Sequence, residues 1–443
     1  MRKKSTIDTP ACGAEKHGAE HAIYRDLRWE KLDNTAHLFP VIAGEQMSNV
    51  YRISVTLTEQ IVPELLQKAL DIVLPKFDGF NMRLRCGVFW YYFEENGKQA
   101  PVVTEESAYP CQFIRANTNS SYLFRVTYYK YRINLEVFHV LTDGMGGLNF
   151  LRELTYQYLR LLHPELNEQD SLHSDTSLSR EDSFLKNYRR SSRKQYRTQR
   201  ALLIKGERFR KGEIGVMHGY MKIPEMKRVC RSYEASINEY LVAAYIWSVY
   251  TEYLNRRTSA APIRVAVPVN LRPHFGSITT KNFFVMVSAE FLPDREDYTF
   301  QEVLGCVKES LRSQMDRAHL ERVFSYNVSY QRNLLMRMMP MSVKKLMMRA
   351  VYTRSALANT STISNIGIVE VSEIYRPYIE QFHAFMTVSM GQHIRCTVCS
   401  YEDTLVFSFS YDLVDMSVQR GFFRRLTADG IQVEIESNGV NYG

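Results

Sequence analysis

A histidine and an aspartate stand four positions apart in the stretch Phe138-His139-Val140-Leu141-Thr142-Asp143-Gly144-Met145-Gly146-Gly147. Apolar and polar residues alternate from Ile133 to Phe138. This is the two-residue period of a half-buried strand, and it puts His139 at the strand's end, on the buried side. After the glycines, leucines recur at helical spacing from Leu148 to Leu162. Because a neutral imidazole takes up a proton near neutral pH, the arrangement predicts a general base at a strand end.

Other interpretations of this stretch stay open. A histidine at a strand end can be a hydrogen-bonded packing residue, and roughly a few per cent of chains this long contain an H-x-x-x-D-G string by chance. The strand before it, and the glycines and helix after it, favour catalysis. Asp143 could orient the imidazole or hold the loop. Gly144 is explained by backbone freedom at the turn.

The bulk composition is that of a globular protein. The 443 residues predict two sizeable domains, and 45% hydrophobic and 23% charged residues fit packed cores. The 28 tyrosines and 23 phenylalanines fit core packing or a ring-lined tunnel. Residues 1–22 are polar and are expected to be disordered or loosely attached.

Several classes of protein are disfavoured. No apolar run approaches membrane-spanning length, and no apolar segment follows the basic start Met1–Thr6, so a cytoplasmic location is expected. Cys396 and Cys399 lie three apart in an expected strand and face opposite sides, which suits free thiols rather than a metal site. No metal site and no Walker or Rossmann glycine pattern is expected.

The chain divides into an α/β half over residues 23–163, a crossover over 164–213 and a second α/β half over 214–443. The second half shows a capping box at Ser236–Glu239, a helix over 300–319, and two Met-rich basic helices separated by Pro340. A Met stripe at helical spacing is usually core, and a lid over an apolar acyl chain is the alternative.

The crossover carries a run of basic residues between Lys186 and Lys211. A solvated linker is the favoured interpretation. A patch that meets cofactor phosphates, an acidic carrier protein or an anionic membrane surface is the alternative. No signature of a nucleic-acid-binding fold accompanies the run, so nucleic acid is not expected as a partner.

In this setting HVLTDG resembles the active-site motif of the chloramphenicol acetyltransferase-like superfamily. Three further stretches resemble the family in its order and carry the similarity from about Arg28 almost to the C-terminus. They are Trp29-Glu30-Lys31-Leu32-Asp33-Asn34 with Phe39-Pro40, Pro268-Val269-Asn270-Leu271-Arg272-Pro273 with Asn282-Phe283-Phe284, and Ser364-Asn365-Ile366-Gly367. Phe138 stands where condensation domains and wax ester synthases carry a first histidine, and the BAHD motif DFGWG has no counterpart. Both departures favour the alcohol acetyltransferase-like branch. Within the superfamily the sequence most resembles bacterial alcohol acetyltransferase-like and condensation-domain-like proteins.

The resemblance implies an α/β fold of two sandwich halves that form a pseudo-dimer, with an active-site tunnel between them. It implies acyl transfer from acyl-CoA to a hydroxyl acceptor, with His139 as general base, no bound cofactor and no metal. By the family's pattern, Asp143 points away from the substrate and pairs with an arginine of the other half, for which Arg272 is the candidate. Three further residues are candidates for oxyanion or substrate contacts: Asn282, Ser364 and Asn365.

Two alternative functions remain. One is condensation-type transfer from an acyl carrier protein to an amine or hydroxyl. The other is a non-catalytic member of the fold that binds lipid or a carrier. The expected partners are an acyl thioester donor and a small alcohol or amine acceptor, with an acyl carrier protein and peripheral membrane contact as further candidates.

Overall fold

The computed structural model describes residues 28–77, 79–115, 119–169, 179–190 and 199–439, so the disorder expected for residues 1–22 lies outside the described residues. The elements follow in chain order: β1 (Trp29–Lys31), α2 (Phe39–Ile42), β2 (Val50–Leu57), α3 (Pro63–Val73), η1 (Leu74–Lys76), β3 (Met82–Cys86), β4 (Tyr91–Glu95), β5 (Thr104–Glu105), β6 (Phe124–Tyr129), β7 (Arg132–Phe138), α4 (Gly144–Leu162), α5 (Leu166–Gln169), α6 (Ser183–Lys186), β8 (Gly215–Lys222), α7 (Ile223–Ser232), α8 (Ile237–Ser248), η2 (Val249–Tyr253), β9 (Ile263–Asn270), α9 (Arg272–Phe275), β10 (Phe284–Phe291), α10 (Phe300–Arg312), α11 (Arg317–Arg332), α12 (Leu334–Met338), α13 (Met341–Ala356), β11 (Ser361–Ile368), η3 (Glu373–Tyr378), β12 (Ile379–Met386), β13 (Ile394–Tyr401), β14 (Thr404–Tyr411), α14 (Ser417–Ala428) and β15 (Glu434–Ser437).

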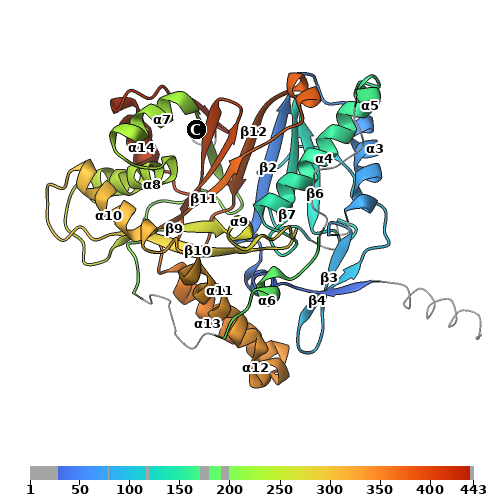
Figure 1. The fold of residues 1–443 in the computed structure, drawn as a ribbon, viewed down its shortest axis with the longest axis horizontal. Helices are drawn as coiled ribbons and strands as arrows, with labels where there is room; N and C mark the ends of the chain where they lie inside the picture. The colour runs from blue at the N-terminus through green and yellow to red at the C-terminus, as the bar shows by residue number, and fades with distance from the viewer. Residues whose placement is uncertain (1–27, 78, 116–118, 170–178, 191–198, 440–443) are drawn as a thin grey trace, which may run out of the picture.

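The first half is built on a five-stranded sheet of order β12-β2-β7-β6-β5, with α3 and α4 side by side on one face (Figure 1). The expectation that β7 is half-buried is wrong, because its polar residues are buried as well. Glu136 is 1% exposed, and its carboxylate accepts from the guanidinium of Arg52 on β2 at 2.9 Å. A central strand covered on both faces can keep a charge only by pairing it.

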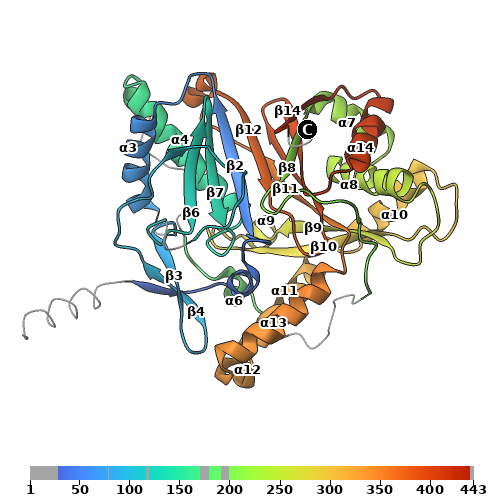
Figure 2. The same ribbon diagram turned by 180° about the vertical axis from the view of Figure 1, so that it is seen from behind.

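The second half is built on a seven-stranded sheet of order β10-β9-β11-β13-β14-β8-β15. α8, α10 and α14 gather on its outer side (Figure 2). Cys396 belongs to the apolar core of this half and Cys399 to the core of the first half, which agrees with the opposite faces expected for them on β13. β13 therefore lies between the two cores and holds the halves together.

One strand crosses between the halves. β12 belongs to the second half in sequence, yet it pairs antiparallel with β2 of the first sheet, with His383 opposite Ser54. The described part of the crossover also packs against the body, since Ala201 and Ile204 are 4% exposed. The described basic side chains between Lys186 and Lys211 are exposed, as a solvated linker requires, whereas residues 201–204 depart from that interpretation because their apolar side chains pack against the body.

Local signals differ in how well they mark helix ends. The capping box is confirmed, because Ser236 and Glu239 each bond the other's backbone N–H. Pro340 is confirmed as the break before α13. The single helix expected over 300–319 is wrong, because α10 ends at Arg312 and Asp316 starts a new one, its Oδ1 accepting from the backbone of His319 at 3.0 Å. An aspartate that caps a helix satisfies N–H groups that would otherwise lack partners.

No helix in the described ranges is both long and apolar enough to span a lipid bilayer.

Candidate active site

His139 lies directly after β7, where the two halves meet. Its backbone N–H donates to the carbonyl of Asn49 at 3.0 Å. The ring is half-buried between aromatic side chains of both halves. Phe39 stacks on it with ring centroids 4.5 Å apart, Tyr51 meets it edge-on at 5.1 Å, and Phe284 of β10 lies at 5.8 Å. These rings fix the plane of the imidazole.

Two residues fix which ring nitrogen carries the proton. The Oδ1 of Asn282 lies 3.1 Å from Nδ1 of His139, and the Nδ2 of Asn282 donates to the Asp33 carboxylate at 2.9 Å. Because the carboxylate only accepts, the amide must turn its oxygen to the imidazole, and Nδ1 must be the protonated nitrogen. Nε2 then holds the lone pair. Within the described ranges Nε2 has no hydrogen-bond partner. The atom is not fully buried.

Burial sets the protonation of this group. Burial lowers the pKa of His139 below its ordinary value of 6.5, against the Asp143 charge and the Asn282 hydrogen bond, which raise it. The ring is therefore neutral at pH 7 and able to act as a base. Burial also raises the pKa of Asp33 to about 6, against the Asn282 hydrogen bond, which lowers it.

Asp143 joins the loop of the first half to the second half. Its Oδ2 lies 2.9 Å from Nη1 of Arg272, and its Oδ1 accepts from Nη2 of Arg272 at 3.0 Å. The same carboxylate caps α4 through the backbone N–H of Gly146 at 3.2 Å and accepts from that of Phe283 at 3.1 Å. These contacts are those of a residue that holds the loop, which is one of the two roles left open by the sequence.

Two later glycines, rather than Gly144, are required by the fold of this loop. Gly144 has no positive φ, and a Cβ there would meet only Ile366 at 3.7 Å, so the expected need for backbone freedom is wrong. A Cβ on Gly146 would collide with the Thr142 side chain and lie 2.8 Å from the Thr280 carbonyl. On Gly147 it would lie 2.6 Å from the Tyr51 hydroxyl. Close packing explains both glycines, against Thr280 of the other half at Gly146 and against Tyr51 of the same half at Gly147.

The two alanine variants of this loop form a matched pair. We expect Gly146→Ala to lower the free energy of unfolding by roughly 1–3 kcal/mol, because neighbours must shift to admit the methyl group. We expect Gly144→Ala to stay within roughly 0.5 kcal/mol of the parent, because the methyl group finds ordinary contact distances. Denaturant unfolding measures both values. Equal effects of the two substitutions would contradict this account of the loop.

The other two expected donors lie on β11. Ser364 shares the half-buried face of the strand with Ile366, which packs against Gly144. Asn365 is exposed on the other face, and its Oδ1 accepts from the backbone N–H of Gly367 at 2.8 Å. This contact stabilises the turn of the chain. Of these two residues, Ser364 is therefore the one whose side chain points towards the region where the two halves meet.

Sequence reasoning missed Asp33 and Arg395 as residues of this site. The charge of Arg395 on β13 lowers the pKa of His139, so the two side chains lie within electrostatic reach. Its Nη1 donates to the Thr387 carbonyl at 3.0 Å, and its Nε is a fully buried atom without a partner in the described ranges. A charged residue between Ile394 and Cys396, inside an otherwise uncharged strand, was the available signal.

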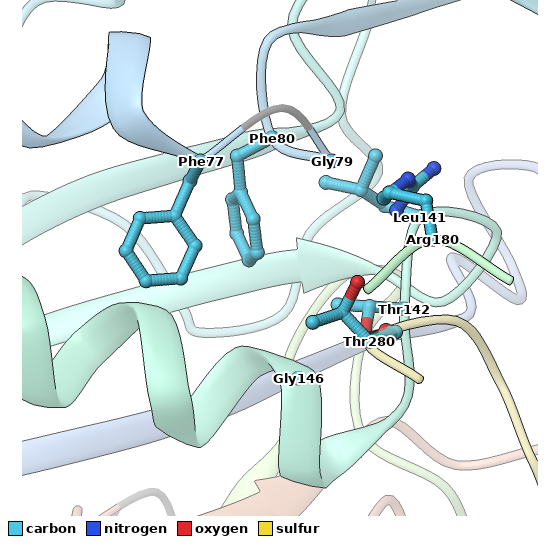
Figure 3. A pocket seen from close by; sticks show the side chains of 8 residues that line it. All are labelled: Phe77, Gly79, Phe80, Leu141, Thr142, Gly146, Arg180 and Thr280. Atoms are coloured by element: carbon cyan, nitrogen blue, oxygen red, sulfur yellow. Dashed lines mark hydrogen bonds between the residues drawn. The ribbon is translucent and has the colours of Figure 1, made fainter. Parts of the chain in front are cut away.

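A small cavity lies beside the loop (Figure 3). Its volume is about 10 Å³, and its lining includes Phe80, Thr142 and Thr280. This is room for about one water molecule, so the cavity is no passage for substrate.

Among the described residues, no three His, Cys, Asp or Glu side chains gather in a way that could hold a metal ion.

We expect Asn282→Ala to show that the amide positions the imidazole. Activity should fall about 10- to 100-fold, because the ring loses its fixed tautomer. The Asn282 hydrogen bond raises the pKa of His139, so its loss lowers that pKa further. The acid limb of the pH–rate profile should therefore move to lower pH. Unchanged activity, or a limb that moves to higher pH, would contradict a positioning role.

Comparison with known proteins places the fold. No family model matches the sequence, and no curated protein matches it either. Among solved structures, TRI101 of F. sporotrichioides, complexed with coenzyme A and T-2, superposes with a TM-score of 0.60 and 10% identity, over 92% of this chain and 99% of that chain. The first condensation domain of the CDA synthetase gives 0.58 and 11%, over 91% and 96%. Polyketide synthase associated protein 5 of Mycobacterium tuberculosis gives 0.56 and 13%, over 90% and 96%.

The chain thus has the chloramphenicol acetyltransferase-like α/β fold, as the resemblance implied. At these identities the likeness concerns the fold alone, and the site has to be argued from its own residues.

Proposed function

We propose that this protein is an acyltransferase that moves an acyl group from a coenzyme A thioester to a hydroxyl acceptor, with His139 as general base. The observation that carries the proposal is the state of the His139 ring. Burial lowers its pKa and so favours the neutral ring, Oδ1 of Asn282 lies 3.1 Å from Nδ1, and Nε2 has no hydrogen-bond partner within the part of the chain that the structure describes. Coenzyme A is also bound by TRI101, which shares the fold.

The chemistry follows from that ring. Nε2 takes the proton of the acceptor hydroxyl while its oxygen forms a bond to the thioester carbonyl carbon, and the carbonyl oxygen becomes an oxyanion. The carbon–sulfur bond of this tetrahedral intermediate then breaks, and Nε2 returns the proton to the leaving thiolate. The products are an ester and a free thiol. Every proton and electron pair is accounted for, and no covalent bond to the protein is needed.

Arg395 is the residue that we assign to the oxyanion. A buried guanidinium without a carboxylate partner is costly to a fold, and such groups concentrate at functional sites. Its charge already acts on the His139 ring and would act on negative charge that develops next to it. Phe138 gives the site one histidine where condensation domains carry two, which favours a hydroxyl acceptor and a coenzyme A donor.

Purified protein tested with acyl-CoAs of several chain lengths and a panel of alcohols and amines, with release of free thiol as the readout, tests the proposal. Release that depends on an alcohol and disappears in His139→Ala supports it. Turnover only with acyl carrier protein thioesters would favour condensation-type transfer. Acyl-chain binding without turnover would favour a non-catalytic member of the fold.

A further inference from the structure

A helical arm projects from the body beside the meeting of the halves. α11 and α13 run out together below the seven-stranded sheet, and α12 forms the far end (Figures 1 and 2). α11 is anchored by buried side chains that include Leu320 and Phe324. α13 buries only Met341, Lys344 and Ala356. The core expected for this Met-rich pair is therefore wrong for α12 and α13, because most of their apolar side chains face solvent, whereas the lid stays a prediction.

The arm exposes a cluster of large apolar side chains. They are Leu334 (67% exposed), Leu335 (78%), Met338 (66%), Val343 (46%), Leu346 (73%), Met347 (42%) and Val351 (68%). The β3–β4 turn adds Val88 (73%) and Phe89 (45%), whose carbonyls accept from the Met341 backbone N–H at 3.0 Å and from Nζ of Lys344 at 2.9 Å. Single exposed apolar residues are ordinary, but a contiguous group marks an interaction surface.

The same segment is strongly and uniformly positive. Residues 332–354 contain no aspartate or glutamate, and their six cations are Arg332, Arg337, Lys344, Lys345, Arg349 and Arg354. None of these cations forms an ion pair with a carboxylate of the described residues; Lys344, for example, sits over the Trp90 ring at 3.4 Å. Lys344 is buried against the body, whereas Arg332, Arg337, Arg349 and Arg354 are exposed and are left for an external anion.

We propose that the arm, defined as residues 332–354 with the β3–β4 turn, docks on the surface of an anionic phospholipid bilayer. Exposed Leu, Met and Phe side chains enter the boundary of the acyl region while the exposed arginines meet lipid phosphates. A convex projecting end suits this occupant, because a bilayer yields to apolar side chains, whereas a protein partner would need a complementary groove.

The arm is also connected to His139. Nε of Arg349 on α13 donates to the Val41 carbonyl of α2 at 3.0 Å, and Phe39 of the same short helix stacks on the His139 ring. A docked arm therefore brings the site close to the membrane surface. Uptake of a lipophilic substrate from the bilayer depends on the proposed acyl transfer. The docking of the arm does not depend on that reaction.

Co-sedimentation of the full chain with vesicles tests the docking separately from activity. We expect binding to phosphatidylcholine vesicles that contain phosphatidylglycerol, weakening as salt is raised, and much weaker binding to phosphatidylcholine alone. Leu335→Ser with Leu346→Ser should lower the partition coefficient at least about tenfold. Arg337→Gln with Arg354→Gln, which changes two exposed cations, should lower binding to the anionic vesicles at least about tenfold and leave binding to phosphatidylcholine alone unchanged. Val102→Ser, which changes a residue 76% exposed outside the arm, should bind as the parent does.

Other outcomes would overturn the proposal. These are no binding to either vesicle, equal binding to both, or an equal loss in Val102→Ser. Capture of an acidic acyl carrier protein by the arm, lost in the same leucine variants while vesicles stay unbound, would assign the surface to a protein instead. Circular dichroism of each variant verifies its fold. Thiol release, measured in parallel without lipid, shows whether the docking or the proposed reaction has failed.

Discussion

His139→Ala is expected to lower kcat for acyl transfer by roughly 10²–10⁴-fold. The acceptor hydroxyl would then lose its proton only to water, because Nε2 of His139 is the basic atom that the aromatic and amide contacts hold in place. The Michaelis constant for the thioester should change little, since the imidazole acts on the transferring proton rather than on the donor's binding. Steady-state thiol release at saturating donor measures both quantities.

A matched control separates chemistry from packing. His319→Ala removes an imidazole from α11, outside the site, and should leave kcat unchanged. The His139→Ala protein should unfold cooperatively with a free energy close to that of the parent. Thiol release that survives His139→Ala at the parent rate would remove the proposed base and with it the reaction.

Asp143→Ala is expected to destabilise the fold by about 3–5 kcal/mol and to reduce activity at the same time. The substitution leaves the Arg272 guanidinium, whose side chain is 13% exposed, without its carboxylate. It also removes the cap of α4 from Gly146 and the acceptor of the Phe283 N–H. Denaturant unfolding with thiol release on the same samples measures both effects.

The partner substitution provides the control. Arg272→Met alone should also destabilise, whereas the double variant with Asp143→Ala should lose less than the sum of the two, because no unpaired charge remains. A double-mutant cycle on the unfolding free energies measures this coupling. Strictly additive losses, or an Asp143→Ala protein as stable and active as the parent, would contradict the loop-holding role.

Much of the secondary structure could be predicted from local sequence patterns. The alternation before His139 and the leucine spacing after it located a strand, a loop and a helix, which are β7 and α4. The capping box at Ser236 and the break at Pro340 were equally local signals. Such signals are readable because they depend on neighbours a few residues away. The same local view failed at Asp316, where a cap interrupts what looks like one helix.

The amino-acid sequence by itself determined the fold class and the presence of an imidazole at a strand end beside a glycine loop. Only the tertiary structure decided what the imidazole can do. Asn282 lies 143 positions from His139, and Asp33 lies 249 positions from Asn282. No periodicity relates residues so far apart. Their contact exists because β7, β10 and the segment after β1 pack at the meeting of the two halves, and this packing selects the ring nitrogen that is left free.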